Sequence, residues 1–226
     1  MSRAPTIIVF CREPIPGETK TRLVPRLGAP NATAIAGAFT LDALAKAQAV
    51  GARIAIAGSG PRGARGSRYF RALARRFDAC IVEQGEGTLG MRMERALAPF
   101  LPGAAVLIGT DTPSIPPRLL RRSLALLRNA AVVIGPSLDG GYYLVGVRGT
   151  MPDIFRGIRW GGARVLEQTV KRLRRAGACY ALGPSWYDVD RWSDLMLLTA
   201  HLRQKATRAA NSCPATARIL QQLGLL

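Results

Sequence analysis

Short apolar runs that alternate with amphipathic stretches of helix length are the feature that most limits what this chain can fold into. The run Ala105-Val106-Leu107-Ile108-Gly109 is typical of a strand that is buried on both faces of a sheet. Strands of this kind, separated by amphipathic segments, predict βα units around a largely parallel sheet. We expect strands at residues 6–11, 53–58, 79–83, 104–109, 131–135, 142–147 and 178–182.

Residues that favour helix ends mark the segments between these strands. Asn31, Ser67, Thr88 and Ser193 are placed to cap helices at their amino ends, and Gly177 is placed to end one. The helices that we expect span residues 32–49, 68–77, 89–100, 116–128, 163–176, 194–206 and 214–223.

Length and composition fit one folded domain. The chain has 226 residues, of which 48% are apolar, and this is enough for one substantial core. No apolar run approaches the roughly 18 residues of a membrane-spanning helix, and the amino terminus has no pattern typical of a cleaved leader. We therefore expect a single domain over residues 1–226, located in the cytoplasm and without a membrane span. The oligomeric state is left open.

The net charge of +18 comes almost entirely from arginines. Because they are spread over most of the expected helices, solvated helix faces explain this charge better than one binding surface does. A second interpretation is the attraction of a phosphorylated ligand. A nucleic-acid partner is the third and is disfavoured, because the aromatic residues are not interleaved with the basic stretches.

Histidine is almost absent, and this excludes several kinds of chemistry. His201 is the only one in the sequence, and it lies in an apolar-rich helical segment. A histidine metal cluster is therefore impossible, and Ser-His-Asp or Cys-His catalysis would depend on His201 alone, which we expect to be structural. The four cysteines are scattered, without the spacing of a disulfide framework or a zinc site. Catalysis would have to use carboxylates, Lys, Arg, hydroxyl groups and a metal ion.

Four aspartates follow expected strands or an aromatic pair. Asp111 comes just after the strand at 104–109, Asp139 follows the next strand, and Asp188 and Asp190 come after Trp186-Tyr187. Ligands of open α/β sheets bind beyond the carboxyl ends of the strands. Carboxylates that meet there suit Mg²⁺, which prefers oxygen ligands and keeps the phosphates of its nucleotide in its coordination shell. The alternative is that each aspartate caps a helix or forms a turn.

The loop after the first strand carries both constraint and positive charge. It reads Arg12-Glu-Pro-Ile-Pro-Gly17-Glu-Thr-Lys20-Thr-Arg22-Leu. Gly17 lets the backbone approach a ligand, and Lys20 and Arg22 can neutralise phosphate charge. The spacing is not that of a P-loop. We interpret the loop as a candidate phosphate-binding segment.

Residues 58–63 match the glycine pattern of a dinucleotide site, and Glu83 lies 20 residues beyond its end. Pro61 inside the motif and Gly66 just after it argue against the helix that such a site needs. Because residues 59–66 are rich in glycine, we expect them to form a loop. A dehydrogenase is therefore a distant alternative.

In order along the chain, these pieces resemble a bacterial family of glycosyltransferase-A-fold proteins that are described as nucleotide-diphospho-sugar transferases. They are distantly related to the molybdenum-cofactor and 2-phospho-L-lactate guanylyltransferases. The stretches that carry the resemblance are 10–23 (P-x-x-G-x-x-K-T-R-L), 108–113 (I-G-T-D-T-P), 135–146 (G-P-S-L-D-G-G-Y-Y-L-V-G), 155–160 and 188–195. The fold that it implies is a Rossmann-like three-layer αβα sandwich with a mostly parallel central sheet.

The resemblance also implies roles for individual residues. Asp111 and Asp190, with Asp188 as a candidate third ligand, would hold Mg²⁺, or Mn²⁺ as the alternative. Lys20, Arg22 and Asp111 would act in catalysis. The nucleotide would be bound by Cys11, Arg12, Gly17, Lys20, Arg22, Gln84 and Gly85. The acceptor would face Asp139, Gly140, Gly141 and Tyr142.

The leading hypothesis is therefore metal-dependent transfer of a nucleotidyl or glycosyl group from a nucleoside triphosphate or nucleotide-sugar to a small acceptor. One alternative is a non-catalytic nucleotide-binding protein of the same fold. Another is a basic nucleic-acid-binding module. The sequence leaves open the base, the acceptor and the group that is transferred.

Overall fold

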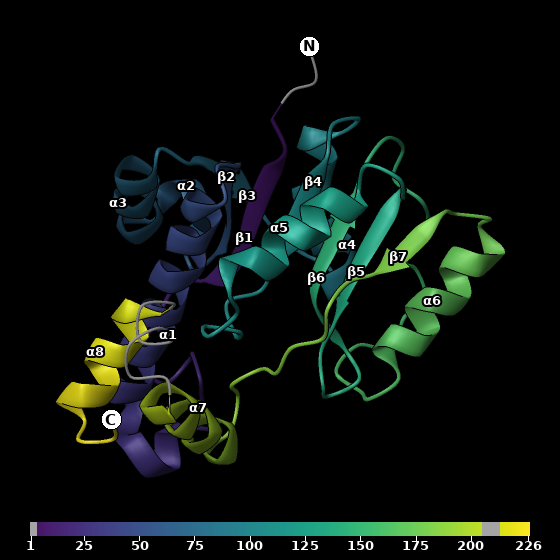
Figure 1. Cartoon of the computed structure of the whole chain (residues 1–226). Coiled ribbons are helices and arrows are strands. Elements are labelled where there is room, and N and C mark those ends of the chain that lie inside the picture. Colours follow the sequence, from purple (N-terminus) through teal and green to yellow (C-terminus); the bar gives the residue numbers. More distant parts are fainter. Residues whose placement is uncertain (1–3, 205–212) are drawn as a thin grey trace.

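The computed structural model describes residues 4–204 and 213–226. A seven-stranded sheet with the order β3-β2-β1-β4-β6-β5-β7 lies at its centre (Figure 1). Every strand that the sequence predicts is present, with ends that differ by at most two residues. The strands are β1 (Thr6–Arg12), β2 (Arg53–Ser59), β3 (Cys80–Glu83), β4 (Ala105–Ile108), β5 (Val132–Pro136), β6 (Tyr142–Val147) and β7 (Tyr180–Leu182).

Most neighbouring strands run parallel. The block β3-β2-β1-β4 is parallel throughout, and β7 is parallel to β5. Only β6 runs antiparallel to its two neighbours, β4 and β5. The carboxyl ends of β1, β2, β3 and β4 therefore meet at one edge of the sheet. This confirms the expected mostly parallel α/β sheet.

Helices cover both faces of the sheet, because successive side chains of a strand point to opposite faces. Ile7 and Val9 of β1 pack on one side with α1, α3 and α5, and Ile8 packs on the other side with α4 and α6. This arrangement confirms the three-layer αβα sandwich. The helices are α1 (Val24–Ala49), α2 (Gly63–Gly66), α3 (Arg68–Phe77), α4 (Leu89–Leu97), α5 (Pro117–Leu126), α6 (Val165–Arg175), α7 (Trp192–Gln204) and α8 (Pro214–Gln222), with a 3₁₀ turn at Ala98–Phe100.

Two predicted amino-terminal caps are confirmed. Ser67 Oγ accepts a hydrogen bond from the Phe70 N–H at 3.4 Å, and Thr88 Oγ1 accepts one from the Met91 N–H at 3.3 Å. These caps fix the starts of α3 and α4, and α4 forms part of the site described below.

The first half of α1 belongs to a third apolar cluster, away from the sheet. Ile35 and Phe39 of α1 pack there with Leu198 of α7 and Leu220 of α8, and Figure 1 shows these helices side by side. None of the helices in the described part of the chain has the length and apolar composition that a membrane crossing requires.

The start of α1 differs from the sequence prediction. The helix begins at Val24 and continues across a kink at Gly28, whose φ of +74° requires glycine. Asn31 lies inside the helix, and its side-chain amide donates to the Leu27 carbonyl at 2.9 Å. The prediction of Asn31 as the amino-terminal cap was therefore wrong, because the helix already begins at Val24 and Asn31 lies within it.

The glycine-rich segment at 59–66 is not a loop throughout, because Gly63–Gly66 form the short helix α2. The Glu83 carboxylate accepts hydrogen bonds from the Ala64 and Arg65 N–H groups, both at 2.8 Å. These are the amides that a dinucleotide pyrophosphate would need. The apparent dinucleotide motif is therefore closed by the protein's own carboxylate.

The cap of α7 also differs from the prediction. Asp194 accepts hydrogen bonds from the N–H groups of Asp190 at 3.1 Å and Arg191 at 2.8 Å, whereas Ser193 donates to Asp194. Asp194 reaches back from the first turn and thereby fixes the backbone of Asp190. Residues 205 and 206, which the sequence assigns to this helix, lie outside the described residues.

Buried polar contacts join α1 to α8 and to the segment that follows β4. The Asp42 carboxylate of α1 accepts from the N–H groups of Ala215 at 3.0 Å and Thr216 at 2.8 Å, and from the Thr216 hydroxyl at 2.5 Å. One turn along α1, the buried Lys46 ammonium donates to the Pro113 carbonyl at 2.5 Å. Pro113 lies in the segment that follows β4, so this hydrogen bond fixes that segment against α1.

Candidate active site

Three segments meet beyond the carboxyl ends of β1 and β4. They are the loop after β1, the residues that follow β4, and the extended segment between β7 and α7. The Val189 N–H donates to the Asp111 carbonyl at 2.8 Å and joins the last two segments. This hydrogen bond holds together two segments that are far apart in the sequence, the one after β4 and the one before α7 (Figure 1).

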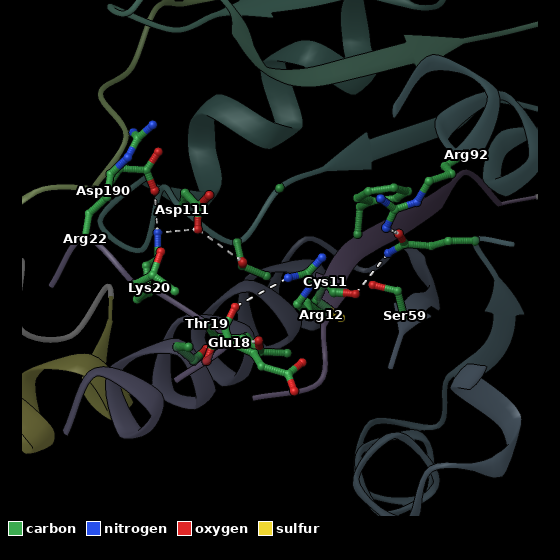
Figure 2. Close-up of a pocket in the computed structure, with 17 residues that line it drawn as sticks. Cys11, Arg12, Glu18, Thr19, Lys20, Arg22, Ser59, Arg92, Asp111 and Asp190 are labelled. Carbon is green, nitrogen blue, oxygen red and sulfur yellow. Dashed lines mark hydrogen bonds and ion pairs between the residues drawn. The ribbon is translucent and has the colours of Figure 1, made fainter. Parts of the chain in front are cut away.

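Lys20 lies at the centre of this junction. Its ammonium is 2.6 Å from Asp111 Oδ1 and 2.7 Å from Asp190 Oδ1, and it donates to the Val189 carbonyl at 2.7 Å. Figure 2 shows the side chain pointing between the two aspartates. The ring of Phe39 lies 5.2 Å from the ammonium. Burial by itself would lower the pKa of Lys20, but the two carboxylates raise that pKa above its ordinary value.

The backbone of Lys20 is strained. Its φ of +49° places a non-glycine residue in the left-handed region, which costs on the order of 1–2 kcal/mol. Strain of this kind persists where surrounding contacts hold it, and it occurs often at functional sites. Here the three contacts of the ammonium hold it.

Asp111 and Asp190 are suited to share a hard cation. Both carboxylates already accept a cationic group through one oxygen, and their side chains are 45% and 41% exposed. Mg²⁺ in proteins is commonly held by one or two carboxylates together with substrate phosphates and water. The two aspartates fit this donor set.

Asp188 is not grouped with these two. Its Oδ2 accepts a hydrogen bond from the Ser137 hydroxyl. Within the described residues, no three His, Cys, Asp or Glu side chains are close enough together to hold a metal ion. Asp188 as a third ligand stays a prediction. The pKa of Asp188 is raised from 3.8 to about 7, mainly by burial. The Ser137 hydrogen bond opposes this shift, and the charges of Asp139, Asp111 and Asp190 add to it.

A cavity of about 460 Å³ opens on one side of Lys20, and we call it the arginine cleft. Middle residues of α1 and the ends of β1 and β2 form its walls. Its polar lining includes Cys11, Arg12, Lys20, Arg22, Ser59, Gln84, Arg92, Asp111 and Asp190.

Two guanidinium groups line this cleft, and Figure 2 shows Arg92 at the end remote from Lys20 and Arg12 between Arg92 and Lys20. Burial first and the Arg12 charge second lower the pKa of Arg92. Ser59 Oγ is buried beside them and has no hydrogen-bond partner among the described residues. An anionic or acceptor-rich ligand would relieve the repulsion between the two arginines and satisfy this hydroxyl.

The Gln84 side chain holds Arg92 in place through a hydrogen bond. Its amide nitrogen donates to the carbonyls of Cys11 at 2.9 Å and Ala57 at 2.6 Å, and its amide oxygen accepts from Arg92. The ring of Phe10 lies 5.4 Å from the Arg92 guanidinium. Gln84 is 1% exposed and holds the Arg92 side chain in place, and its direct contact with a nucleotide stays a prediction.

The glycines predicted to line the nucleotide site are placed differently. Gly85 lines a shallower cavity that shares Arg12, Ser59 and Arg92 with the arginine cleft. Gly17 is not among the residues of the cleft wall, and its φ of +82° shows that it shapes the turn before Lys20. Cys11 is buried at the cleft, and burial raises the pKa of its thiol to about 12.

A second cavity, of about 340 Å³, lies on the other side of the aspartates, and we call it the carboxylate pocket. Arg22 and four carboxylates line it, together with an aromatic and apolar wall. Its lining includes Arg22, Leu89, Met93, Asp111, Asp139, Gly141, Tyr142, Trp160, Asp188 and Asp190.

Gly140 does not line the carboxylate pocket. A Cβ added there would lie 2.0 Å from the Ala163 carbonyl oxygen, and the φ of Gly140 is +87°. Its missing side chain therefore makes room for the start of α6. Of the four residues predicted to face an acceptor, Asp139, Gly141 and Tyr142 line the pocket and Gly140 does not, and their role in acceptor binding stays a prediction.

The two cavities share Arg22, Gly109, Asp111 and Asp190. A ligand group at these residues is accessible from both sides. The arrangement can bind two molecules and bring them together at the carboxylate pair.

Sequence reasoning did not find Arg92, Ser59 or the contact between Lys20 and the aspartates. Arg92 lies within a helix of an arginine-rich chain, where no spacing separates it from surface arginines. The partners of Lys20 depend on the backbone conformation of its loop, which the spacing of apolar residues in the sequence does not reveal.

Comparisons with known proteins agree with this architecture. Residues 40–162 match the family model described as "Uncharacterized protein conserved in bacteria (DUF2064)". A candidate nucleotide-diphospho-sugar transferase from Desulfovibrio desulfuricans G20 is 31% identical, with a TM-score of 0.84 over 100% of this chain and 97% of that one. No curated protein matches the chain.

Two more distant structures share the fold. A nucleotidyl transferase from Methanothermobacter thermautotrophicus is 14% identical, with a TM-score of 0.54 over 90% of this chain and 100% of that one. The glucosyl-3-phosphoglycerate synthase of Mycobacterium tuberculosis, solved with Mn²⁺, UDP and glucosyl-3-phosphoglycerate, is 12% identical, with a TM-score of 0.52 over 94% of this chain and 80% of that one.

Proposed function

The chain belongs to the bacterial DUF2064 family, and on that premise we propose that it is a transferase that uses a metal-bound nucleotide. The donor would be a nucleoside triphosphate or a nucleotide-sugar, and the acceptor a small molecule. The observation that carries the proposal is the carboxylate pair Asp111 and Asp190, which lies where the two cavities meet and already holds a cation, the Lys20 ammonium.

The arginine cleft suits the nucleotide part of the donor. Four cationic side chains line it, those of Arg12, Lys20, Arg22 and Arg92. Such groups bind phosphate oxygens and other hydrogen-bond acceptors of a nucleotide. The exposed oxygens of Asp111 and Asp190 would hold Mg²⁺ or Mn²⁺. When bound, such an ion would neutralise charge on the donor phosphates.

The shared residues suit the reacting centre. Arg22 lines both cavities, so its guanidinium can stabilise charge that develops on the leaving phosphate. In nucleotidyl transfer an acceptor oxygen would bond to the α-phosphorus and pyrophosphate would leave. In glycosyl transfer that oxygen would bond to the anomeric carbon and a nucleoside diphosphate would leave. The acceptor would approach from the carboxylate pocket in both cases.

The test is a thermal-shift panel of nucleoside triphosphates and nucleotide-sugars, each with and without Mg²⁺. A ligand that binds only the folded state raises the melting temperature by mass action. We expect a metal-dependent shift for at least one nucleotide. Asp111→Asn should abolish it, because the substitution removes one of the two carboxylates.

The matched control is Asp78→Asn. Asp78 is exposed beyond α3, near the amino ends of the strands, so the same change of charge there should leave the shift intact. An unaltered metal-dependent shift in Asp111→Asn would overturn the metal assignment. Absence of any shift, together with steeply salt-dependent binding to DNA or RNA, would favour the nucleic-acid alternative.

A further inference from the structure

A third cavity, of about 520 Å³, lies at the amino ends of β1, β2 and β3, and we call it the amino-edge cavity. This edge of the sheet is opposite to the one where Asp111 and Asp190 gather. Of the described residues, none lines both this cavity and the arginine cleft or the carboxylate pocket. Its volume is within the range of about 300–1,000 Å³ that is typical of small-molecule sites.

The strand register brings three polar side chains to one face of the sheet at this edge. Thr6 pairs with Arg53 across β1 and β2, and Ala55 pairs with Cys80 across β2 and β3. Residues two apart in a strand point to the same face, so Arg53 and Ala55 share a face. A hydroxyl, a guanidinium and a thiol therefore project from three neighbouring strands on the same side, and all three side chains line the cavity.

The Thr6 hydroxyl is the first sign that a ligand belongs here. The side chain is 1% exposed, and its Oγ1 has no hydrogen-bond partner among the described residues. A buried hydroxyl without a partner is unfavourable, and buried polar groups are rarely left in this state. A ligand in the cavity can supply the missing partner.

Two opposite charges face the cavity without pairing with each other. Arg53 Nε donates to the Ala4 carbonyl at 3.2 Å, which orients the guanidinium and leaves its two terminal nitrogens without a partner in the described part of the chain. Asp78, in the connection between α3 and β3, is exposed at the same cavity, and the salt bridges of the described residues do not include it. A ligand that carries both a carboxylate and an ammonium group matches this pair.

The remaining lining is largely apolar. Phe100 of the 3₁₀ turn is partly buried against the face of the sheet that α4 and α6 cover, the same face to which Ile8, two residues after Thr6, points. Ile54 and Phe77 border the cavity from the apolar cluster on the other face. An apolar side chain of the ligand would be removed from water by these residues.

From this arrangement we infer that the amino-edge cavity binds a free α-amino acid with an apolar side chain. The ligand carboxylate would accept hydrogen bonds from the Arg53 guanidinium and the Thr6 hydroxyl. Its ammonium would pair with Asp78, and its side chain would lie against Phe100. The inference is independent of the proposed function, because the two sites lie at opposite edges of the sheet.

Cys80 provides a readout at the cavity itself. Cys80 and Cys179 are both exposed, but Cys179 lies before β7 and does not line the cavity. Alkylation of both thiols by iodoacetamide is followed in one sample by mass spectrometry, over hours because burial raises the pKa of Cys80. With millimolar L-phenylalanine or L-leucine we expect Cys80 to react at least threefold more slowly and Cys179 at an unchanged rate. An unchanged rate at Cys80 would overturn the inference.

Analogues that lack one part of the ligand test each contact separately. 3-Phenylpropanoate keeps the carboxylate and the ring of phenylalanine without the ammonium, phenethylamine lacks the carboxylate, and glycine has both charges without a side chain. We expect protection of Cys80 by each of them to need concentrations at least tenfold higher than with L-phenylalanine. Protection at equal concentration by any of the three would overturn the inference.

Substitutions at the two charges test the assignment of residues. Arg53→Gln and Asp78→Asn should each weaken the binding of L-phenylalanine at least fivefold. Both positions are exposed, and Asn tolerates the left-handed backbone of Asp78, whose φ is +48°, so both variants should fold. Arg118→Gln, on the exposed start of α5, is the control for the loss of one positive charge. Unchanged affinity in Arg53→Gln or in Asp78→Asn would overturn the inference.

Thr6→Val distinguishes a ligand contact from a structural role. The substitution removes the unpaired hydroxyl, so the free protein should melt at a higher temperature. Binding of L-phenylalanine should nevertheless become several-fold weaker, because the ligand carboxylate loses a donor. Unchanged affinity in Thr6→Val would overturn the inference, since the unpaired hydroxyl is the observation that points to a ligand.

Discussion

The Lys20 ammonium and the Asp111 carboxylate form an ion pair of 2.6 Å, and Asp190 completes the contact at 2.7 Å. A divalent ion shared by the two aspartates would therefore compete with the Lys20 ammonium for the same carboxylate oxygens. The ammonium reduces the negative charge of the pair and holds both side chains in place. This explains how two half-exposed carboxylates stay close together.

Replacing Lys20 by Met should tighten the binding of free Mn²⁺. Two unit charges about 4 Å apart interact by about 4 kcal/mol at an effective dielectric constant of 20, and exposure of the carboxylates reduces this considerably. We expect a gain in Mn²⁺ affinity of roughly tenfold. Electron paramagnetic resonance of free Mn²⁺ measures it directly. Lys171→Met on the exposed face of α6 is the control, and an unchanged affinity in Lys20→Met would contradict this account.

Arg92→Gln should weaken nucleotide binding while preserving the fold. Arg92 contacts the Gln84 side chain and faces the arginine cleft, and a hydrogen bond to a charged group contributes about 1.5–3 kcal/mol. The expected loss of affinity is tenfold or more, measured by calorimetry with the nucleotide that gives the largest thermal shift. Arg71→Gln, on the exposed surface of α3, changes the net charge equally and should have little effect. Equal losses in the two variants would point to the overall charge of the protein.

The sequence predicts the sheet well, because strands such as β1 and β4 are buried on both faces and read as continuous apolar runs. It also predicts that Asp111, Asp139 and Asp190 gather at one edge, since parallel strands end together. It does not predict which atoms touch. The partner of Lys20 depends on a left-handed backbone at that residue, and the role of Glu83 depends on a four-residue helix with no periodicity of its own.

Asp188 should make stability fall as the pH rises towards neutrality. Its pKa is raised from 3.8 to about 7 in the folded protein, so between these values the folded state binds more protons than the unfolded state. Stability then decreases with rising pH across this window. Asp188→Asn should flatten that part of the profile and raise the melting temperature at pH 8. Melting temperatures from pH 4 to pH 8 in EDTA measure it, and an equally steep fall in the variant would contradict it.

Gly140→Ala should cost far more stability than Gly149→Ala. Both glycines have left-handed φ angles, +87° and +81°, so alanine at either carries a penalty of about 1–2 kcal/mol. At Gly149 an added Cβ meets nothing within 4 Å, whereas at Gly140 it meets the Ala163 carbonyl oxygen at 2.0 Å. The Leu166 N–H also donates to the Gly140 carbonyl at 2.9 Å, so relief of the clash would pull this turn from α6.

The additional loss at Gly140 should be about 1–3 kcal/mol, as for overpacking of a close contact. Urea unfolding of the two variants measures the difference. Because the same turn presents Asp139, Gly140→Ala should also weaken ligand binding in the carboxylate pocket, which Gly149→Ala leaves intact. Equal destabilisation in the two variants would mean that backbone conformation alone, and not packing against α6, requires glycine at residue 140.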